Sequence, residues 1–231
     1  MRSFVLIGTV AGLLAAAFGA SAADDPLAET LARIDRAAAG FKGLTADMKK
    51  ISHTAVLNED STDIGTIALK RGPKPNDLRV LFDIKQPDAK QIGFGDNKCE
   101  IYAPKINTVQ IYDLGKNKGL VDQFLLLGFG SNSSELKRGY NIKLGGPEEI
   151  EGQKTVRIEL NPKSKEVLSY FTRVDLWISD ATGLAIQQKV FEPGGDYILA
   201  TYSNMKLEPN LPDSAVRLRI PKDAKKEYPQ K

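Results

Sequence analysis

The 231-residue sequence predicts an α+β fold built around one large, strongly curved antiparallel sheet. Three observations support this prediction. Apolar residues recur at helical spacing only near the start, in residues 27–41, and from about residue 44 they alternate with a period of two. The alternating segments are short and are separated by turns rich in Gly, Pro, Asn and Asp, which is the pattern of an antiparallel meander.

The first residues predict a secretory signal peptide. Arg2 provides the positive start, an apolar run follows from Phe4 to Phe18, and residues 20–22, Ala-Ser-Ala, provide small residues for cleavage. We expect cleavage between Ala22 and Ala23, so that residues 1–22 are removed and residues 23–231 form a single domain in the periplasm. The alternative is an uncleaved N-terminal anchor.

The next segment predicts an amphipathic helix. Asp25 and Pro26 supply a carboxylate cap and a first-turn proline. One apolar stripe follows at spacings of four and three residues, made of Leu27, Leu31, Ile34, Ala38 and Phe41. Gly40 or Gly43 is expected to end the helix.

About ten or eleven strands are expected after this helix. The first group covers residues 45–57, 65–71, 77–87, 90–104 (two strands around a turn) and 107–114. The second group covers residues 140–146, 154–162, 172–180, 184–193, 196–207 and 215–221. The basic segment at the C-terminus, residues 221–231, is expected to be a solvated tail.

A helical insertion at residues 119–139 interrupts the strands and contains an apolar run. Residues 122–132 read DQFLLLGFGSN, in which the apolar side chains are Phe124, Leu125, Leu126, Leu127 and Phe129. The run is too short to span a bilayer, which takes about 20 apolar residues, and too continuous for one face of a helix in water. Another part of the chain must therefore cover it.

Little in the sequence points to catalysis, a metal or nucleic acid. His53 is the only histidine and Cys99 the only cysteine, so a metal cluster, a catalytic pair or an internal disulfide lacks its components. Cys99 is expected to be a buried apolar residue, the alternative being a reactive thiol. The net charge of +3 comes from interspersed signs, which argues against nucleic acid. We expect no catalytic residues, no metal and no cofactor.

The order of several motifs resembles the periplasmic outer-membrane lipoprotein carrier family, the LolA-like proteins. These motifs are FKGLTADMKK (41–50), GTIALKR (65–71), FDIKQPD (82–88), YNIKL (140–144), residues 181–207 and RLRIPKDA (217–224). Each motif is weak alone, but their order covers nearly the whole chain after the signal peptide. The resemblance implies an incomplete β-barrel of about eleven strands with a helical lid over an apolar cavity.

The resemblance also implies a function without covalent chemistry. Such carriers take the acyl chains of lipoproteins from an inner-membrane exporter, shield them, and pass them to an outer-membrane acceptor. The expected partners are therefore acylated lipoproteins or related lipids, the exporter and the acceptor, with the carrier a monomer.

The site residues follow from the same resemblance. Arg71, at the end of GTIALKR, corresponds to an arginine that holds the lid closed; alternatively it stays in water at the rim. The apolar run of residues 124–129 falls where the family has its lid. Candidates for the cavity lining are Leu69, Val80, Phe82, Phe94 and Ile101, each of which could equally be ordinary core.

Two departures and two alternatives accompany this interpretation. The loop KRGPKPND at residues 70–77 is longer than the family's, and Cys99 or Glu100 replaces an aromatic residue.

One alternative is a periplasmic regulator of the same fold that senses lipid or stress; such regulators carry a second C-terminal domain, which we do not expect here. The other is an enzyme acting on lipids or glycans through the carboxylates in residues 148–151, Glu148, Glu149 and Glu151.

Overall fold

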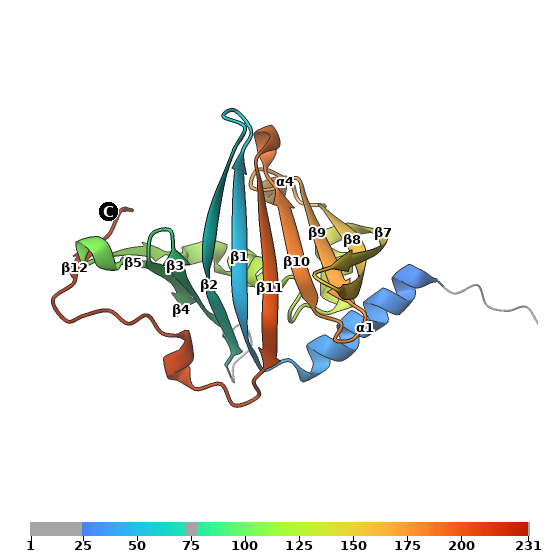
Figure 1. The fold of residues 1–231 in the computed structure, drawn as a ribbon, viewed down its shortest axis with the longest axis horizontal. Coiled ribbons are helices and arrows are strands. Elements are labelled where there is room, and N and C mark those ends of the chain that lie inside the picture. Colours follow the sequence, from blue (N-terminus) through green and yellow to red (C-terminus); the bar gives the residue numbers. More distant parts are fainter. Residues whose placement is uncertain (1–24, 73–77, 231) are drawn as a thin grey trace, which may run out of the picture.

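The computed structural model describes residues 25–72 and 78–230 (Figure 1). The expected signal peptide and the centre of the loop at residues 73–77 lie outside the described residues. Within the described part of the chain, no helix is long and apolar enough to cross a bilayer.

The predicted first helix is confirmed as α1, Pro26–Gly40. The Asp25 carboxylate accepts hydrogen bonds from the backbone N–H groups of Leu27 and Ala28, at 3.0 and 3.2 Å, and thereby caps the helix start. Leu31 and Ile34 of the apolar stripe are buried against the sheet.

The predicted α+β class with one large sheet is confirmed; the sheet has twelve strands and is antiparallel except for the pairing of β12 with β6. Their spatial order is β12-β6-β5-β4-β3-β2-β1-β11-β10-β9-β8-β7, and the sheet is open, with β12 and β7 at its edges. The first six are β1 (Gly43–Thr54), β2 (Glu59–Arg71), β3 (Leu78–Gln86), β4 (Lys90–Gly95), β5 (Lys98–Ala103) and β6 (Thr108–Asp113). The others are β7 (Tyr140–Ile150), β8 (Gln153–Pro162), β9 (Arg173–Ser179), β10 (Ala185–Phe191), β11 (Tyr197–Leu207) and β12 (Lys225–Glu227).

Two antiparallel meanders join at the centre of this sheet. Strands β1 to β6 follow one another, as do β7 to β11, and the pairing of β1 with β11 connects the two halves. The helical insertion predicted at residues 119–139 forms α2 (Lys118–Leu126) and α3 (Ser133–Gly139), and η2 (Gly115–Asn117) precedes it. The remaining short helices are η1 (Pro104–Ile106), α4 (Lys165–Leu168), η3 (Pro193–Gly195) and η4 (Asp213–Val216).

The C-terminal segment differs from the prediction. The strand expected at residues 215–221 is wrong: Ala215 and Val216 end η4, and beyond them Leu218 packs over Gly93 and the backbone N–H of Arg219 donates to the Gln91 side chain at 2.8 Å. The expected solvated tail instead contains β12, which pairs in parallel with β6, the strand that would otherwise form this edge of the sheet. The tail therefore covers a sheet edge that would otherwise present unpaired backbone groups.

One face of the sheet, here called the inner face, carries two adjoining apolar clusters. The first joins α1 to strands β7–β10 through residues such as Ile34, Ile158 and Leu176. The second lies on strands β1–β3 and β11 and includes Leu44 and Leu69.

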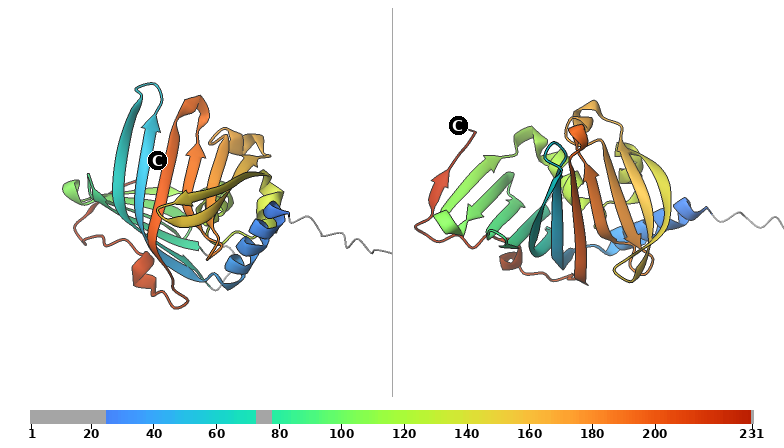
Figure 2. Two further views of the ribbon diagram at one scale, coloured as in Figure 1. Left: turned by 45° about the vertical axis from the view of Figure 1, so that its right-hand side comes forward. Right: turned by 45° about the horizontal axis from the view of Figure 1, so that its top comes forward.

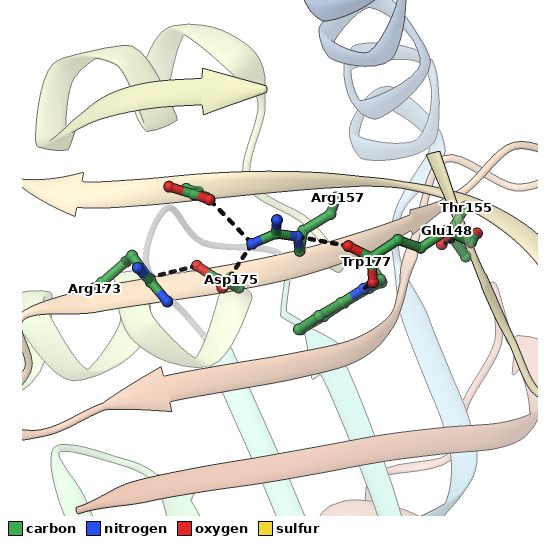
Figure 3. Close-up of polar contacts among 7 residues, drawn as sticks. Glu148, Thr155, Arg157, Arg173, Asp175 and Trp177 are labelled. Carbon is green, nitrogen blue, oxygen red and sulfur yellow. Dashed lines mark hydrogen bonds and ion pairs between the residues drawn. The ribbon is translucent and has the colours of Figure 1, made fainter. Parts of the chain in front are cut away.

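The opposite, outer face carries an ion-pair network on β7–β9 that centres on Arg157 (Figure 3). Its guanidinium group contacts Glu148 at 2.7 Å, Glu159 at 3.0 Å and Asp175 at 3.3 Å. The indole N–H of Trp177 donates to Glu148 at 2.6 Å. The network therefore connects the C-terminal half of edge strand β7, through Glu148, to β8 and β9, the next two strands of the sheet.

Loss of Arg157 is expected to destabilise the fold. Arg157→Leu leaves three carboxylates close together without their shared cation, so the free energy of unfolding should fall by about 2–3 kcal/mol in urea titrations. Arg217→Leu is the control, because Arg217 is 65% exposed and its ion pair with Asp213 spans 3.8 Å. That change should stay within about 0.5 kcal/mol of the parent. Equal effects of the two substitutions would contradict a stabilising network.

Candidate functional site

A cavity of about 720 Å³ lies on the inner face of the sheet. Its sheet wall is mostly apolar and is lined by Met48, Ile67, Phe82, Ile92, Phe94, Val190, Ile198 and Ala200, together with the polar side chains of Lys50, Tyr112, Gln188 and Tyr202. Its opposite wall comes from the helical insertion and is lined by Leu114, Leu120, Val121, Phe124, Leu125 and Phe129. The volume falls in the range of about 300–1,000 Å³ that is usual for small-ligand pockets.

The period-two pattern of the strands explains the apolar sheet wall. Ile67 of β2 pairs with Phe82 of β3, which pairs with Ile92 of β4, so three apolar side chains form one row across the inner face. The rings of Phe82 and Phe94 meet edge to face, with their centroids 6.3 Å apart.

The segment of residues 124–131, here called the lid segment, covers part of this wall. Helix α2 ends at Leu126, whose carbonyl accepts hydrogen bonds from the N–H groups of Phe129, Gly130 and Ser131 at 3.0, 3.0 and 3.2 Å. The chain thus folds into a compact turn that turns the side chains of Leu127 and Phe129 toward the sheet. Both are buried, at 2% and 3% exposure.

Three carbonyl groups of the lid segment accept hydrogen bonds from the sheet. The Leu127 carbonyl accepts from Gln188 Nε2 at 2.5 Å, and the Gly128 carbonyl from the backbone N–H of Ala185 at 2.8 Å. The Gly130 carbonyl accepts from Arg71 Nη2 at 2.5 Å. The lid segment is therefore held from both halves of the sheet, by β10 and by the end of β2.

The glycines of the lid segment allow this close approach. Gly128 has φ of +80°, and a Cβ there would lie 2.5 Å from the Cβ of Ala185. A Cβ on Gly130 would lie 2.9 Å from Phe41 and 3.1 Å from the Arg71 guanidinium. A side chain at either position would push the segment away from its donors.

Arg71 points to the inner face, toward the lid segment. It is half-buried, its guanidinium lies 5.9 Å from the centre of the Phe41 ring, and its Nη2 atom holds the Gly130 carbonyl. The structure thus places the guanidinium against the segment that the resemblance implies it would hold.

The other predicted lid residues lie on or under the cavity wall. Phe124, Leu125 and Phe129 line the cavity, whereas Leu127 belongs to the first apolar cluster. Leu126 packs against the second cluster.

Two of the five residues predicted to line the cavity do so, and three do not. Phe82 and Phe94 line the cavity. Leu69 and Val80, with no exposed surface, lie in the second apolar cluster beyond the end of the cavity. Ile101 pairs with Ile92 one strand farther toward the edge and is not among the lining residues.

Gln188 and Tyr202 were not identified from the sequence. The Tyr202 hydroxyl donates to Gln188 Oε1 at 3.2 Å, which directs the Gln188 amide N–H toward the Leu127 carbonyl. The Phe129 ring rests edge-on against Tyr202 with the centroids 5.0 Å apart. The available signal was the position of Gln188 in phase with the apolar Ile186 and Val190, where an unpaired amide would be costly.

Charged residues lie at the end of the cavity nearer the β1–β2 turn. Lys50 lines it and pairs with Asp63 at 2.8 Å, while Lys90 reaches the same carboxylate at 3.4 Å. Burial opposes ionisation of Asp63, but the hydrogen bond and charge of Lys50 and the charge of Lys90 outweigh it, so the pKa of Asp63 lies below its ordinary value.

Cys99 faces the inner side opposite Phe94 on the neighbouring strand. Burial, together with the charge of Glu100, raises the pKa of the Cys99 thiol to about 11. A thiol with this pKa is protonated near neutral pH and is a weak nucleophile.

The residues considered for an enzyme lie away from the cavity wall. Glu148 pairs with Arg157 and Trp177 on the outer face, and Glu149 and Glu151 are exposed at the β7–β8 turn. His53 contacts Asp60 at 2.7 Å and stacks on Tyr197. Among the described residues, no cluster of His, Cys, Asp and Glu is arranged to hold a metal ion.

Comparison with protein-family models and with curated proteins gives no match for this chain. Among solved structures, an uncharacterized conserved protein from Thermus thermophilus matches 88% of this chain and 99% of its own length, with 14% identity and a TM-score of 0.52. MucB matches 85% of this chain and 64% of its own length, less than two thirds, with 12% identity and a TM-score of 0.49. A LolA superfamily protein from Nitrosomonas europaea matches 83% and 97%, with 13% identity and a TM-score of 0.39. At these identities the likeness is one of fold alone.

The lowered pKa of Asp63 predicts a pH-dependent contribution to stability. The unfolded chain binds the Asp63 proton more tightly than the folded chain, so pairing stabilises the fold above the ordinary value of 3.8 and the effect is lost as the pH falls below it. Asp63→Asn should lower the free energy of unfolding at pH 7 by roughly 0.5–1 kcal/mol. The difference from the parent should shrink as urea titrations are repeated below pH 3.8. For Asp88→Asn, whose carboxylate is 80% exposed, little difference is expected at any pH. A gap between Asp63→Asn and the parent that persists in acid would contradict the assignment.

Proposed function

We propose that this chain is a non-enzymatic periplasmic carrier that holds the acyl chains of lipoproteins, or of related lipids, in the inner-face cavity. The observation that carries the proposal is the apolar cavity of about 720 Å³ beneath a segment tied to the sheet through three backbone carbonyls. In this proposal the open sheet acts as the incomplete barrel implied by the motifs of the sequence, and the lid segment acts as its movable cover.

The energetics of acyl binding make release the demanding step. Transfer of each CH₂ group from water contributes about 0.8 kcal/mol, so one 16-carbon chain carries on the order of 12 kcal/mol. A protein that only enclosed such a chain would hold it too tightly to pass it on. Closed contacts of the empty state, which must break before the cavity widens, lower the net affinity.

The lid segment has contacts suited to this purpose. Its hydrogen bonds to Arg71 and Gln188 both end on backbone carbonyls, so they can break and reform without rearrangement of the sheet. The side chains of Phe124, Leu125 and Phe129 already face the cavity, so they can contact an acyl chain in place of the sheet.

The cellular setting of the proposal comes from the sequence. The expected signal peptide would direct the chain to the periplasm, and the resemblance implies an inner-membrane exporter as donor and an outer-membrane acceptor. A mixed charge distribution with a net charge of +3 suits lipid cargo better than nucleic acid.

The cargo can be identified by native mass spectrometry of protein produced in the periplasm with its signal peptide. Retained acylated protein would support the lipoprotein carrier, whereas retained free phospholipid or glycolipid would redirect the function to lipid transfer. An empty protein that also fails to bind an added diacylated or triacylated lipopeptide would contradict the proposal.

Arg71→Leu is expected to bind lipopeptide more tightly and release it more slowly. The substitution removes a charge-assisted hydrogen bond of the closed state, so opening costs less and the apparent affinity should rise about tenfold. Fluorescence titration with a labelled lipopeptide measures the affinity, and transfer to acceptor vesicles measures the release rate.

Two controls separate the latch from a general effect of charge. Arg71→Lys keeps a donor and should stay within a few-fold of the parent. Lys70→Leu removes the neighbouring cation, which faces the outer side and pairs with Asp213, and should leave both measurements unchanged. Parental affinity and release in Arg71→Leu would show that Arg71 does not hold the lid.

A further inference from the structure

One end of the sheet carries several exposed large apolar side chains. The register places His53, Tyr197, Phe191 and Arg173 in one row across four strands, so the connections that extend beyond this row lie at the same end. These connections are the β1–β2 turn, η3 and the loop containing α4. Figures 1 and 2 show all three together at the end of the molecule away from α1.

The exposed residues at this end are here called the apolar rim. Val56 and Leu57, at the tip of the β1–β2 turn, are 92% and 64% exposed. Leu168 and Tyr170, in the α4 loop, are 38% and 53% exposed. Contact of these side chains with water is unfavourable, so their position at one end indicates a partner surface.

The tip of the β1–β2 turn is braced in its projecting position. The N–H groups of Leu57 and Asn58 donate to the carbonyls of Thr54 and Ala55, each at 3.2 Å. The N–H of Ala55 donates to the Asp196 carboxylate at 2.7 Å, which ties the tip to the neighbouring β10–β11 connection. The backbone of the tip is thus engaged, and the apolar side chains of Val56 and Leu57 are the groups left outward.

The cavity extends toward the same end. Tyr170 belongs to the rim and also lines the cavity, and Lys50, Glu192 and Ile198 line its nearby wall. The other end is covered by the lid segment, which Arg71 holds at the opposite end of β2. The rim therefore adjoins one end of the cavity.

Charges near the rim show no positive surplus, because Glu59, Glu192 and Asp196 flank its connections. Lys50 and Lys90 share Asp63, and His53 lies 2.7 Å from Asp60. Residues 54–58, which form the tip, contain no charged side chain. A partner surface of strong negative charge, such as an anionic membrane or nucleic acid, is therefore not favoured over a neutral one.

We propose that the apolar rim inserts into the interface of a zwitterionic phospholipid bilayer and holds the adjoining end of the cavity close to the bilayer surface. Lys50 lines the cavity and precedes the end of β1 by four residues, so the tip lies at least about 13 Å beyond it. The interfacial layer on each side of a bilayer is about 5–8 Å thick. Insertion of Val56 and Leu57 to the acyl boundary thus leaves Lys50 roughly 5–8 Å outside the headgroup layer, so this end of the cavity faces the bilayer surface. This inference rests on the proposed function only in taking acyl chains as the cargo.

Flotation with phosphatidylcholine vesicles tests the proposal. The parent protein should float with the vesicles, and Val56→Ser/Leu57→Ser should lower the partition constant at least about tenfold, because two exposed apolar groups are lost. Adding phosphatidylglycerol or raising the salt concentration should change parental binding little, since the rim lacks surplus positive charge.

A matched control separates the rim from general surface apolarity. Leu207→Ser removes a leucine of similar exposure, 53%, at the opposite end of β11, and should leave vesicle binding unchanged. Failure of the parent to float, parental flotation of the rim variant, or equal loss in Leu207→Ser would each overturn the proposal. Absence of vesicle binding together with a concentration-dependent dimer that Leu57→Ser abolishes would assign the rim to a second copy of the chain.

A second measurement keeps this inference distinct from the proposed function. Binding of a fluorescent fatty acid in buffer without vesicles reports on the cavity alone and should be the same for the parent and Val56→Ser/Leu57→Ser. Normal fatty-acid binding without flotation would overturn only the membrane contact. Flotation without fatty-acid binding would overturn only the use of the cavity for acyl chains.

Discussion

The need to satisfy the backbone carbonyls at the end of α2 governs the arrangement of the candidate site. A helix end leaves carbonyl groups without partners, and an apolar run that follows it toward a sheet must find donors or leave those groups buried and unpaired. Here the Leu126 carbonyl is satisfied by the turn itself, and those of Leu127, Gly128 and Gly130 by the sheet. The lid segment can lie on an apolar surface because the sheet offers three donors at matching positions.

The same segment connects the two apolar clusters of the inner face. Leu127 packs with the cluster on α1 and β7–β10, whereas Phe129, two residues later, packs with the cluster on β1–β3 and β11. Alternate side chains of one short turn thus fill the seam between the two meanders. Motion of the segment would expose both clusters, so the free energy of the closed state comes from packing as well as from hydrogen bonds.

Local patterns in the sequence were sufficient to predict most elements but few long-range contacts. The apolar spacing of Leu31 and Ile34 identified α1, and the alternation of Val80 and Phe82 identified β3 with its inner face. The same alternation in residues 215–221 wrongly indicated a strand, because it arises there from Leu218 packing on the sheet rather than from backbone pairing. Period-two patterns report which side chains are buried and do not report which backbone groups pair.

The site shows the same limit more sharply. The apolar run of residues 124–129 could be located in the sequence, and the resemblance to the carrier family singled out Arg71, with a position in water at the rim as the alternative. Leu69 and Phe82 have the same phase on adjacent strands, yet Leu69 lies in a closed core and Phe82 in the cavity wall. The difference depends on where the lid segment comes to rest along the strands, which is set by Gln188, Ala185 and Arg71 together. Such a position is a property of three strands at once, so it follows from the assembled sheet and not from any single stretch of sequence.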